Sequence, residues 1–222
     1  KYDWTIADGR MASGTNLNRK FNVQGVFKTV FTASTNRNCV DSMSEIYPVY
    51  APVYKGFDAF PVCDGEPVLF VNKSKTSVPY TSFAWYFGDK KTATIENPVH
   101  VYAKPGTYPV SLRFQTLPGC FYDTASVAVV NPLPIPGFST GSGVGSIVNP
   151  EITVTDMSSG ADSIEYRTSD GFVFKQPNFV HRFPDSGTYT IVQRVSTDKG
   201  CKDSLSKEVV ILFMYTLHVP GV

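Results

Sequence analysis

The sequence predicts an all-β chain of antiparallel sandwiches in tandem, and three observations lead to this prediction. Distinctive residues recur at a spacing of 81 residues, as Cys39, Cys120 and Cys201 do. Short runs of β-branched and aromatic residues alternate with polar residues at a period of two, which is typical of strands with one buried face. No segment has a convincing helical period with caps. A repeat without insertions indicates one structural unit copied along the chain.

The spacing divides the chain into one partial and two complete units. We expect a partial repeat at residues 1–51 that lacks its N-terminal strands, and a complete repeat at residues 52–133. A third repeat at residues 134–222 runs into the start of a C-terminal segment. The connecting segments 47–52 and 131–136 are rich in proline, which favours extended conformations that hold neighbouring domains apart. The expected arrangement is therefore an elongated array.

Repeat two shows the expected strands most clearly. The runs 68–71 and 83–87 are short, rich in β-forming residues and bounded by turn residues. The run 108–114 alternates apolar and polar side chains, and residues 127–129 supply a returning strand. The Gly- and Ser-rich stretch 139–146 is predicted to be a loop near the start of repeat three.

Composition and charge narrow the classes of function. The chain is 42% hydrophobic and 14% aromatic, which indicates folded domains. Its net charge of +1 provides no basic stripe for phosphates, so no nucleic-acid partner is expected. The longest apolar run, 209–219, is shorter than the ~20 residues that cross a bilayer, so we expect a terminal strand and no membrane insertion.

A motif recurs in each unit: an aromatic strand that ends in an Asp turn, a second aromatic, a Gly-x-aromatic step, and a Cys with a nearby Asp. Asp-Gly suits a tight turn, a Trp at this place would anchor the core, and a Tyr after the Gly would pin the chain crossover. The motif residues are Trp4, Asp8 and Gly25 in repeat one, Trp85, Asp89, His100, Tyr102, Gly106 and Tyr108 in repeat two, and Asp170, His181, Gly187 and Tyr189 in repeat three.

This pattern closely resembles the PKD (polycystic kidney disease) domain, an Ig-like sandwich with a W-x-F-G-D-G run followed by H-x-Y and G-x-Y. Repeat three departs from it with Tyr166 for the Trp and Thr168 for the Phe, and repeat one has Arg19 for the His. The departures affect the polar positions of the motif more than the apolar ones. The resemblance implies tandem PKD-type sandwiches and a motif that serves folding.

The units are also similar to the PKD repeats of very large surface adhesins of gliding Bacteroidetes. The similarity lies in 62–65 at the opening of a unit, in the closing Gly-Cys-x-Asp-Ser, and in 213–221, which resembles the start of a type IX secretion domain. It implies an extracellular, cell-surface segment of spacer or adhesion modules, active in gliding motility or attachment. The implied partners are other domains of the same chain, outer-membrane secretion or motility components, and surface polysaccharide.

A second hypothesis is a polymer-binding accessory module of a secreted hydrolase, such as a protease or a chitinase. An exposed aromatic row on one sheet face would favour it, whereas burial of Trp4 and Trp85 would count against it.

Candidate catalytic and metal-binding residues favour structural roles. His100 and His181 occupy equivalent positions in two repeats, and a catalytic histidine is rarely duplicated in this way. Asp8, Asp89 and Asp170 each bring one or two oxygens to a turn, fewer than calcium requires. No nucleophile, zinc or phosphate-loop motif is present. We therefore expect no enzyme activity, no cofactor and no metal.

Four cysteines in a chain expected to be secreted suggest a disulfide. Cys63 and Cys120 lie in the same unit and are the best candidate pair. Repeat three has Val144 where Cys63 would map, which leaves Cys201 without a partner in its own unit. The two positions of the candidate pair could also lie at opposite ends of the sandwich, beyond the Cα limit of ~7 Å.

The Bacteroidetes resemblance implies O-glycosylation at Asp-Ser/Thr-apolar triplets. Four triplets fit, with acceptor residues Ser42, Thr124, Ser163 and Ser204. The alternative interpretation is that Asp and Ser or Thr shape the hairpin.

Overall fold

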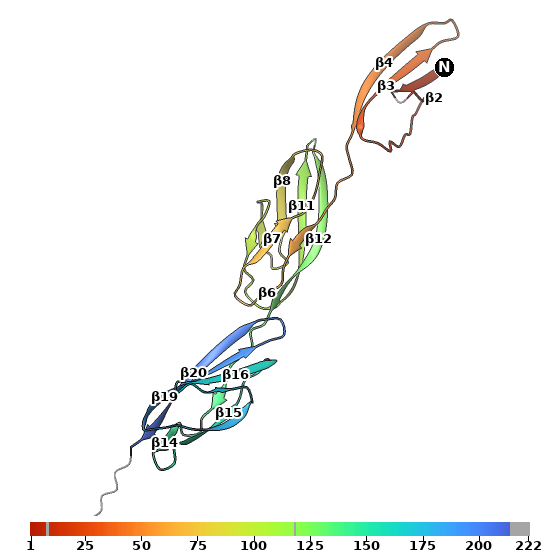
Figure 1. The fold of residues 1–222 in the computed structure, drawn as a ribbon. Helices are drawn as coiled ribbons and strands as arrows, with labels where there is room; N and C mark the ends of the chain where they lie inside the picture. Colours follow the sequence, from red (N-terminus) through yellow and green to blue (C-terminus); the bar gives the residue numbers. More distant parts are fainter. Residues whose placement is uncertain (8, 118, 214–222) are drawn as a thin grey trace, which may run out of the picture. The chain divides into compact units, whose positions relative to one another are not determined.

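The computed structural model describes residues 1–7, 9–117 and 119–213, which form strands joined by turns and loops (Figure 1). These ranges contain no helix, and hence none that is long and apolar enough to cross a membrane. The predicted all-β class is confirmed, with sheets that are mostly antiparallel.

Residues 2–49 form a single antiparallel sheet in the order β2-β1-β3-β4. Its strands are β1 (Tyr2–Ile6), β2 (Met11–Ser13), β3 (Gly25–Ser34) and β4 (Val40–Val49). Pro48, expected in a linker, pairs with Val26 inside β4. A proline is tolerated there because β4 is an edge strand.

Residues 57–131 form two sheets. The smaller has the order β10-β7-β5, with β5 (Phe57–Ala59), β7 (Val68–Asn72) and β10 (Val99–His100). The larger has the order β6-β12-β11-β8-β9, with β6 (Val62–Cys63), β8 (Tyr80–Tyr86), β9 (Thr92–Ala93), β11 (Gly106–Thr116) and β12 (Cys120–Asn131). β6 pairs with β12 in parallel.

Residues 138–212 form two further sheets with the same plan. The smaller has the order β13-β15-β18, with β13 (Phe138–Ser139), β15 (Glu151–Asp156) and β18 (Asn178–Arg182). The larger has the order β14-β20-β19-β16-β17, with β14 (Val144–Ser146), β16 (Ser163–Thr168), β17 (Val173–Phe174), β19 (Gly187–Ser196) and β20 (Lys202–Leu212).

Two local predictions differ from this arrangement. The stretch 139–146, expected to be a loop, ends in β14, which pairs in parallel with β20 from Val144↔Val210 to Ser146↔Leu212. This pairing comes from more than 60 residues further along the chain, so local Gly and Ser content does not reveal it. The apolar run 209–219 begins in β20, and its part beyond residue 213 lies outside the described residues.

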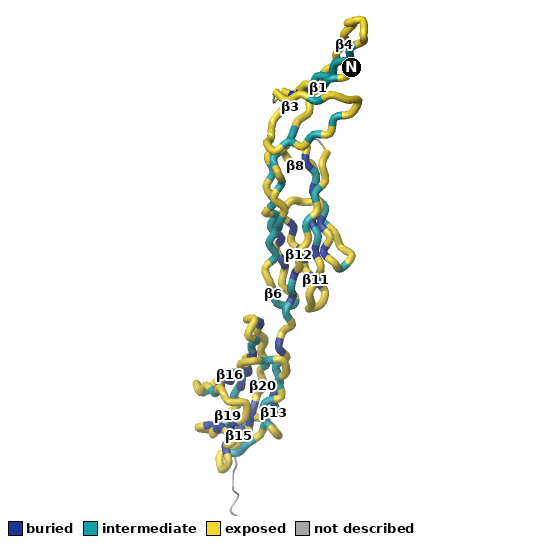
Figure 2. Tube along the Cα trace, turned by 90° about the vertical axis from the view of Figure 1, so that its right-hand side faces the viewer, coloured by how far each residue is buried: buried dark blue, intermediate teal, exposed yellow. Residues whose placement is uncertain are grey.

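The core of the middle sandwich follows the period-two pattern. Val110, Leu112 and Phe114 are buried on β11, whereas Arg113 between them is exposed. Trp85 on β8 is 0% exposed and meets Phe57 of the smaller sheet edge-on, with ring centroids 5.0 Å apart. Buried positions therefore recur along β11 and β12, and β8 contributes Trp85 (Figure 2). Each large apolar side chain buried in this way contributes about 1.5–3 kcal/mol.

The N-terminal sheet leaves its corresponding face more open. Trp4 and Phe31 occupy the positions of Trp85 and Leu112 and contact each other, with ring centroids 4.6 Å apart, but both are only half-buried. Tyr47 on β4 is 46% exposed. These three side chains line a groove of about 280 Å³. Residues 2–49 supply one sheet, whereas each of the other two repeats places a second sheet over this face.

We predict that the two tryptophans differ in solvent access. The chain has only two, so Trp4→Phe leaves Trp85 as the sole reporter and Trp85→Phe leaves Trp4. Acrylamide should quench the fluorescence of Trp4 several-fold more strongly than that of Trp85, and the Trp4 emission should lie at longer wavelength, because only Trp85 is fully buried. Equal quenching in the two variants would contradict the open face.

Candidate functional site

The motif tryptophans are held by one recurring hydrogen bond. The indole Nε1 of Trp4 donates to the Gly14 carbonyl at 2.9 Å, and that of Trp85 donates to the Ile95 carbonyl at 3.0 Å. Both acceptors lie ten residues after the ring, beyond the turn that ends the aromatic strand. A buried indole requires such an acceptor, so the bond couples the core to the turn.

Repeat three replaces the tryptophan with Tyr166, which enters a different buried network. The Tyr166 hydroxyl donates to Asp156 Oδ1 at 3.1 Å, and Gln193 Nε2 donates to the same oxygen at 2.7 Å. Gln193 also bonds both backbone groups of Gly137. Burial raises the pKa of the Asp156 carboxyl, but hydrogen bonds from Ser158, Tyr166 and Gln193 outweigh it and leave the pKa below its ordinary value. Burial and the neighbouring Asp156 raise the pKa of Tyr166.

The Gly-x-Tyr step forms a turn-locking contact in both complete repeats. The Tyr108 hydroxyl donates to the Lys104 carbonyl at 2.7 Å, and the Tyr189 hydroxyl donates to the Asp185 carbonyl at 3.0 Å. The preceding Gly106 and Gly187 have φ of 157° and 152°, a conformation that L side chains rarely adopt. Tyr102, the second motif aromatic, stacks on Tyr108 with centroids 3.9 Å apart.

The motif aspartate and histidine of repeat three form a buried pair. His181 Nε2 lies 2.7 Å from Asp170 Oδ2, with side-chain exposures of 6% and 7%. Burial raises the pKa of the Asp170 carboxyl, but hydrogen bonds to the Thr168 and His181 side chains outweigh it and hold the pKa below its ordinary value of 3.8. The pair joins the turn after β16 to β18, and thus one sheet to the other.

In repeat two the corresponding aspartate shapes its own turn. Asp89 Oδ1 accepts the Lys91 amide at 3.0 Å, and His100 is buried. In repeat one the equivalent residue, Asp8, lies outside the described residues, and Gly25 opens β3 with a φ of 158°.

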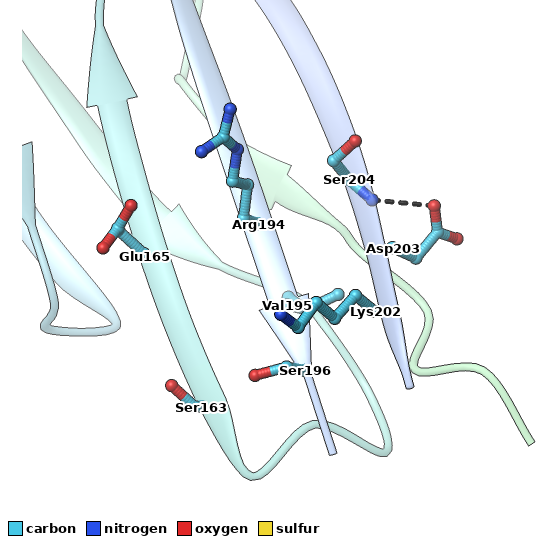
Figure 3. Close-up of a pocket in the computed structure, with 8 residues that line it drawn as sticks. All are labelled: Ser163, Glu165, Arg194, Val195, Ser196, Lys202, Asp203 and Ser204. Carbon is cyan, nitrogen blue, oxygen red and sulfur yellow. Dashed lines mark hydrogen bonds between the residues drawn. The ribbon is translucent and has the colours of Figure 1, made fainter. Parts of the chain in front are cut away.

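An open hollow of about 600 Å³ lies on the larger sheet of repeat three (Figure 3). Glu165 of β16, Arg194 of β19 and Lys202 of β20 line it from three neighbouring strands, together with Ser163, Val195, Ser196, Asp203 and Ser204. Arg167 Nε donates to Glu165 at 2.7 Å, and this bond lowers the pKa of Glu165.

The chemistry of this hollow is that of a polar contact surface. Its carboxylates are already engaged, because Asp203 accepts the Ser204 amide at 2.7 Å and Glu165 accepts from Arg167. None of the lining residues is a histidine or a cysteine, so its serines have no imidazole beside them to act as a base. Cationic side chains and hydroxyls suit hydrogen bonding to a hydroxylated or anionic ligand.

The predicted pairing of Cys63 with Cys120 is wrong: Cys63 is bonded to Cys201, with 5.6 Å between their Cα atoms. Strand geometry explains the error. Cys63 lies beside Asn131 at the end of β12, whereas Cys120 is the first residue of that strand. At about 3.3 Å per residue the two cysteines are roughly 36 Å apart, far beyond bonding distance. Cys120 and Cys39 are exposed free thiols.

The four candidate glycosylation triplets differ in their local structure. Ser42 and Ser204 are exposed, and each amide donates to the preceding aspartate at 2.8 and 2.7 Å. Ser163 is exposed and follows Asp162, which accepts the Asp198 amide. Thr124 is half-buried, and its Asp123 is bound to Arg113 at 2.8 Å instead.

The family comparison concerns the middle of the chain. Residues 49–131 match the family model of the PKD domain. This range contains every strand from β5 to β12, so the match covers the second sandwich. A search of curated proteins gave no match.

Solved structures provide three further similarities. The PKD1 domain of Vibrio anguillarum Epp is 25% identical, with a TM-score of 0.35, over 38% of this chain and 99% of that one. The PKD1 domain of the Vibrio cholerae metalloprotease PrtV is 27% identical, with a TM-score of 0.32, over 35% and 94%. The titin I-band fragment is 13% identical, with a TM-score of 0.50, over 97% and 88%. The similarity to titin concerns the fold alone.

We predict that the buried pair of repeat three is a stabilising contact with a defined pH dependence. Asp170→Ala should lower the free energy of unfolding by about 1–3 kcal/mol, because His181 loses its buried partner. Since the pKa of Asp170 is lowered on folding, its contribution is complete above pH 3.8 and is lost as the pH falls below that value. Urea titrations between pH 2 and pH 7 would measure this.

The matched control is Asp123→Ala, which removes the exposed ion pair with Arg113. Solvent screens this pair, so we expect the control to leave stability almost unchanged. Equal losses in the two variants, or no acid dependence of the Asp170 difference, would contradict the role assigned to the buried pair.

Proposed function

We propose that this chain is a non-enzymatic segment of a large secreted cell-surface protein, in which PKD-type sandwiches act as spacer or adhesion modules. The observation that carries the proposal is the use of the recurring side chains. Trp85 holds its turn, Tyr108 and Tyr189 lock theirs, and His181 joins two sheets through Asp170. The residues that could have been catalytic candidates thus make contacts that stabilise the fold. In addition, Ig-like and PKD-type domains are typically non-catalytic modules.

The disulfide supports an extracellular location. Disulfides form and persist in oxidising environments, and Cys63–Cys201 is bonded in the folded chain. Extracellular placement, a Bacteroidetes adhesin as parent, type IX secretion and a role in gliding motility belong to this proposal. So does the division into repeats at residues 1–51, 52–133 and 134–222.

If the modules act in adhesion and not only as spacers, surface polysaccharide is the proposed class of ligand. The hollow on repeat three supports this, because Arg194, Lys202 and the serine side chains line it with hydrogen-bonding groups. Other domains of the same chain and outer-membrane secretion or motility components are the proposed protein partners.

The alternative, a polymer-binding accessory module of a secreted protease or chitinase, fits less well. Such a module commonly presents aromatic side chains to its polymer, and the 0% exposure of Trp85 counts against this. The open groove of Trp4, Phe31 and Tyr47 on the N-terminal sheet is the observation that favours it.

We predict that an antibody raised against this chain labels intact cells that produce the protein. The expected result is surface fluorescence comparable with that of permeabilised cells, while a cytoplasmic marker stains only permeabilised cells. Labelling confined to permeabilised cells would overturn the cell-surface proposal. Co-sedimentation of the chain with insoluble chitin, together with a catalytic domain encoded in the same reading frame, would instead favour the hydrolase alternative.

We predict modification of at least one of Ser42, Ser163 and Ser204 when the protein is isolated from its source. Their exposed positions leave room for a glycan, whereas the half-buried Thr124 should be modified least. Intact-protein mass should exceed the sequence mass, and peptide mapping should locate the addition. An unmodified mass, or glycan on Thr124 alone, would contradict the prediction.

A further inference from the structure

The disulfide joins two different repeats, so it changes the covalent path along the chain. Cys63 ends β6 in the second repeat and Cys201 follows the turn between β19 and β20 in the third, with a sequence separation of 138 residues. The bond therefore closes a ring that contains the strands from β7 to β19.

Hydrogen bonds hold Cys63 in place. β6 pairs with the end of β12, where Cys63 lies opposite Asn131, and the Asp64 amide donates to the Asn131 carbonyl at 2.9 Å. The Cys63 amide donates to the Glu66 carboxylate at 3.1 Å, and the Glu66 amide returns a bond to the Cys63 carbonyl at 3.0 Å. The cysteine thus sits between a strand pair and a tight turn.

The turn before Cys201 is equally well defined. The Thr197 amide donates to the Cys201 carbonyl at 2.9 Å, and the Cys201 amide donates to Thr197 Oγ1 at 3.2 Å. Gly200 adopts a φ of 86°, which the turn requires. Cys201 is 1% exposed, in contrast to the exposed Cys39 on the same turn of repeat one. Hydrogen bonds therefore fix the backbone on both sides of the disulfide.

We propose that this bond makes the chain a force-bearing segment in which tension bypasses the strands from β7 to β19 and is carried by β5, β6 and β20, which lie outside the ring. A pull applied to the two ends runs from residue 1 to Cys63, crosses the two sulfur atoms, and continues from Cys201 to the C-terminus. The residues inside the ring then add no length, whether or not they are folded. The proposal depends on the covalent path and not on what the modules bind.

Reduction removes this constraint. A dithiol reductant transfers two electrons and two protons to the bond, which leaves thiols on Cys63 and Cys201 and a cyclic disulfide in the reductant. The 138-residue separation then adds an extended length of about 480 Å to the path, at 3.3–3.6 Å per residue. The proline-rich connection that begins at Pro132 then carries the load between the two sandwiches.

Single-molecule stretching tests the proposal. The full chain carrying Cys39→Ser and Cys120→Ser retains only the bonded pair and is pulled through handle domains fused to its two ends. The oxidised protein should stretch about 480 Å less at full extension than the same protein in dithiothreitol. A chain with Cys63→Ser and Cys201→Ser added should show the longer extension in both conditions.

The fully extended length depends on covalent connections alone, so the comparison holds even if a variant folds poorly. Equal extension of the oxidised and reduced proteins would overturn the proposal. Peptide mapping of the unsubstituted protein that joins Cys63 or Cys201 to Cys39 or Cys120 would overturn it as well. The antibody labelling of intact cells does not depend on the stretching experiment. The force-bearing proposal and the cell-surface proposal can therefore be supported or overturned separately.

Discussion

An indole N–H that is buried between two sheets must find an acceptor, and Trp85 meets this requirement at the Ile95 carbonyl. The bond determines more than the position of one ring. It requires Trp85 to face inward, and since side chains alternate along a strand, Phe83 and Phe87 face the same way. A slip of one residue would expose all three, so the register of β8 against β11, with Trp85 opposite Leu112, follows from this contact. The turn beyond β8 is fixed at the same time.

Repeat three also provides an acceptor for the buried polar group of its core aromatic residue, but with different atoms. Tyr166 is as fully buried as Trp85, but its hydroxyl reaches Asp156 instead of a carbonyl ten residues ahead. The half-buried carboxylate of Asp156 accepts several hydrogen bonds, and Gln193, on the strand next to β16, supplies one of them. Repeat two has Leu112 at the place of Gln193. The Tyr and Gln substitutions are thus physically linked, because Gln193 Nε2 donates to the Tyr166 hydroxyl at 2.9 Å and both side chains donate to Asp156.

The sequence was sufficient for contacts that depend on local pattern. Strand alternation identified Val110, Leu112 and Phe114 as one face, and the Gly-x-Tyr step placed Tyr108 at a chain crossover. It was insufficient where partners come together only through the fold. The pairing of Asp170 with His181 joins two sheets across 11 residues. The sequence pattern indicates a turn at Asp170 and a hydrogen bond at His181, but it does not indicate that the two residues are partners.

The network around Gln193 was missed for the same reason, although its signal was present. A glutamine at a position where the other complete repeat has leucine indicates a buried polar partner, and the concurrent change from Trp to Tyr indicates where that partner lies. The disulfide was mispredicted because its partners were sought within one unit. The 81-residue recurrence describes what each unit contains, and it does not report which ends of successive units meet.

Residues that recur at the 81-residue spacing and residues that do not recur make different kinds of contact. Those that recur, such as Tyr108 and Tyr189, make their contacts inside their own repeat and account for its fold. Cys63 does not recur, since Val144 takes its place in repeat three, and its bond leaves the repeat. The turn that precedes Cys201 has an equivalent in repeat one, which precedes Cys39. There Asn38, with a φ of 59°, takes the position of Gly200. This position thus carries a cysteine in all three repeats, and only Cys201 is bonded, because Cys63 lies beside it. Mechanical properties of such an array can therefore change by substitution at a position like Cys63 without any change to the core.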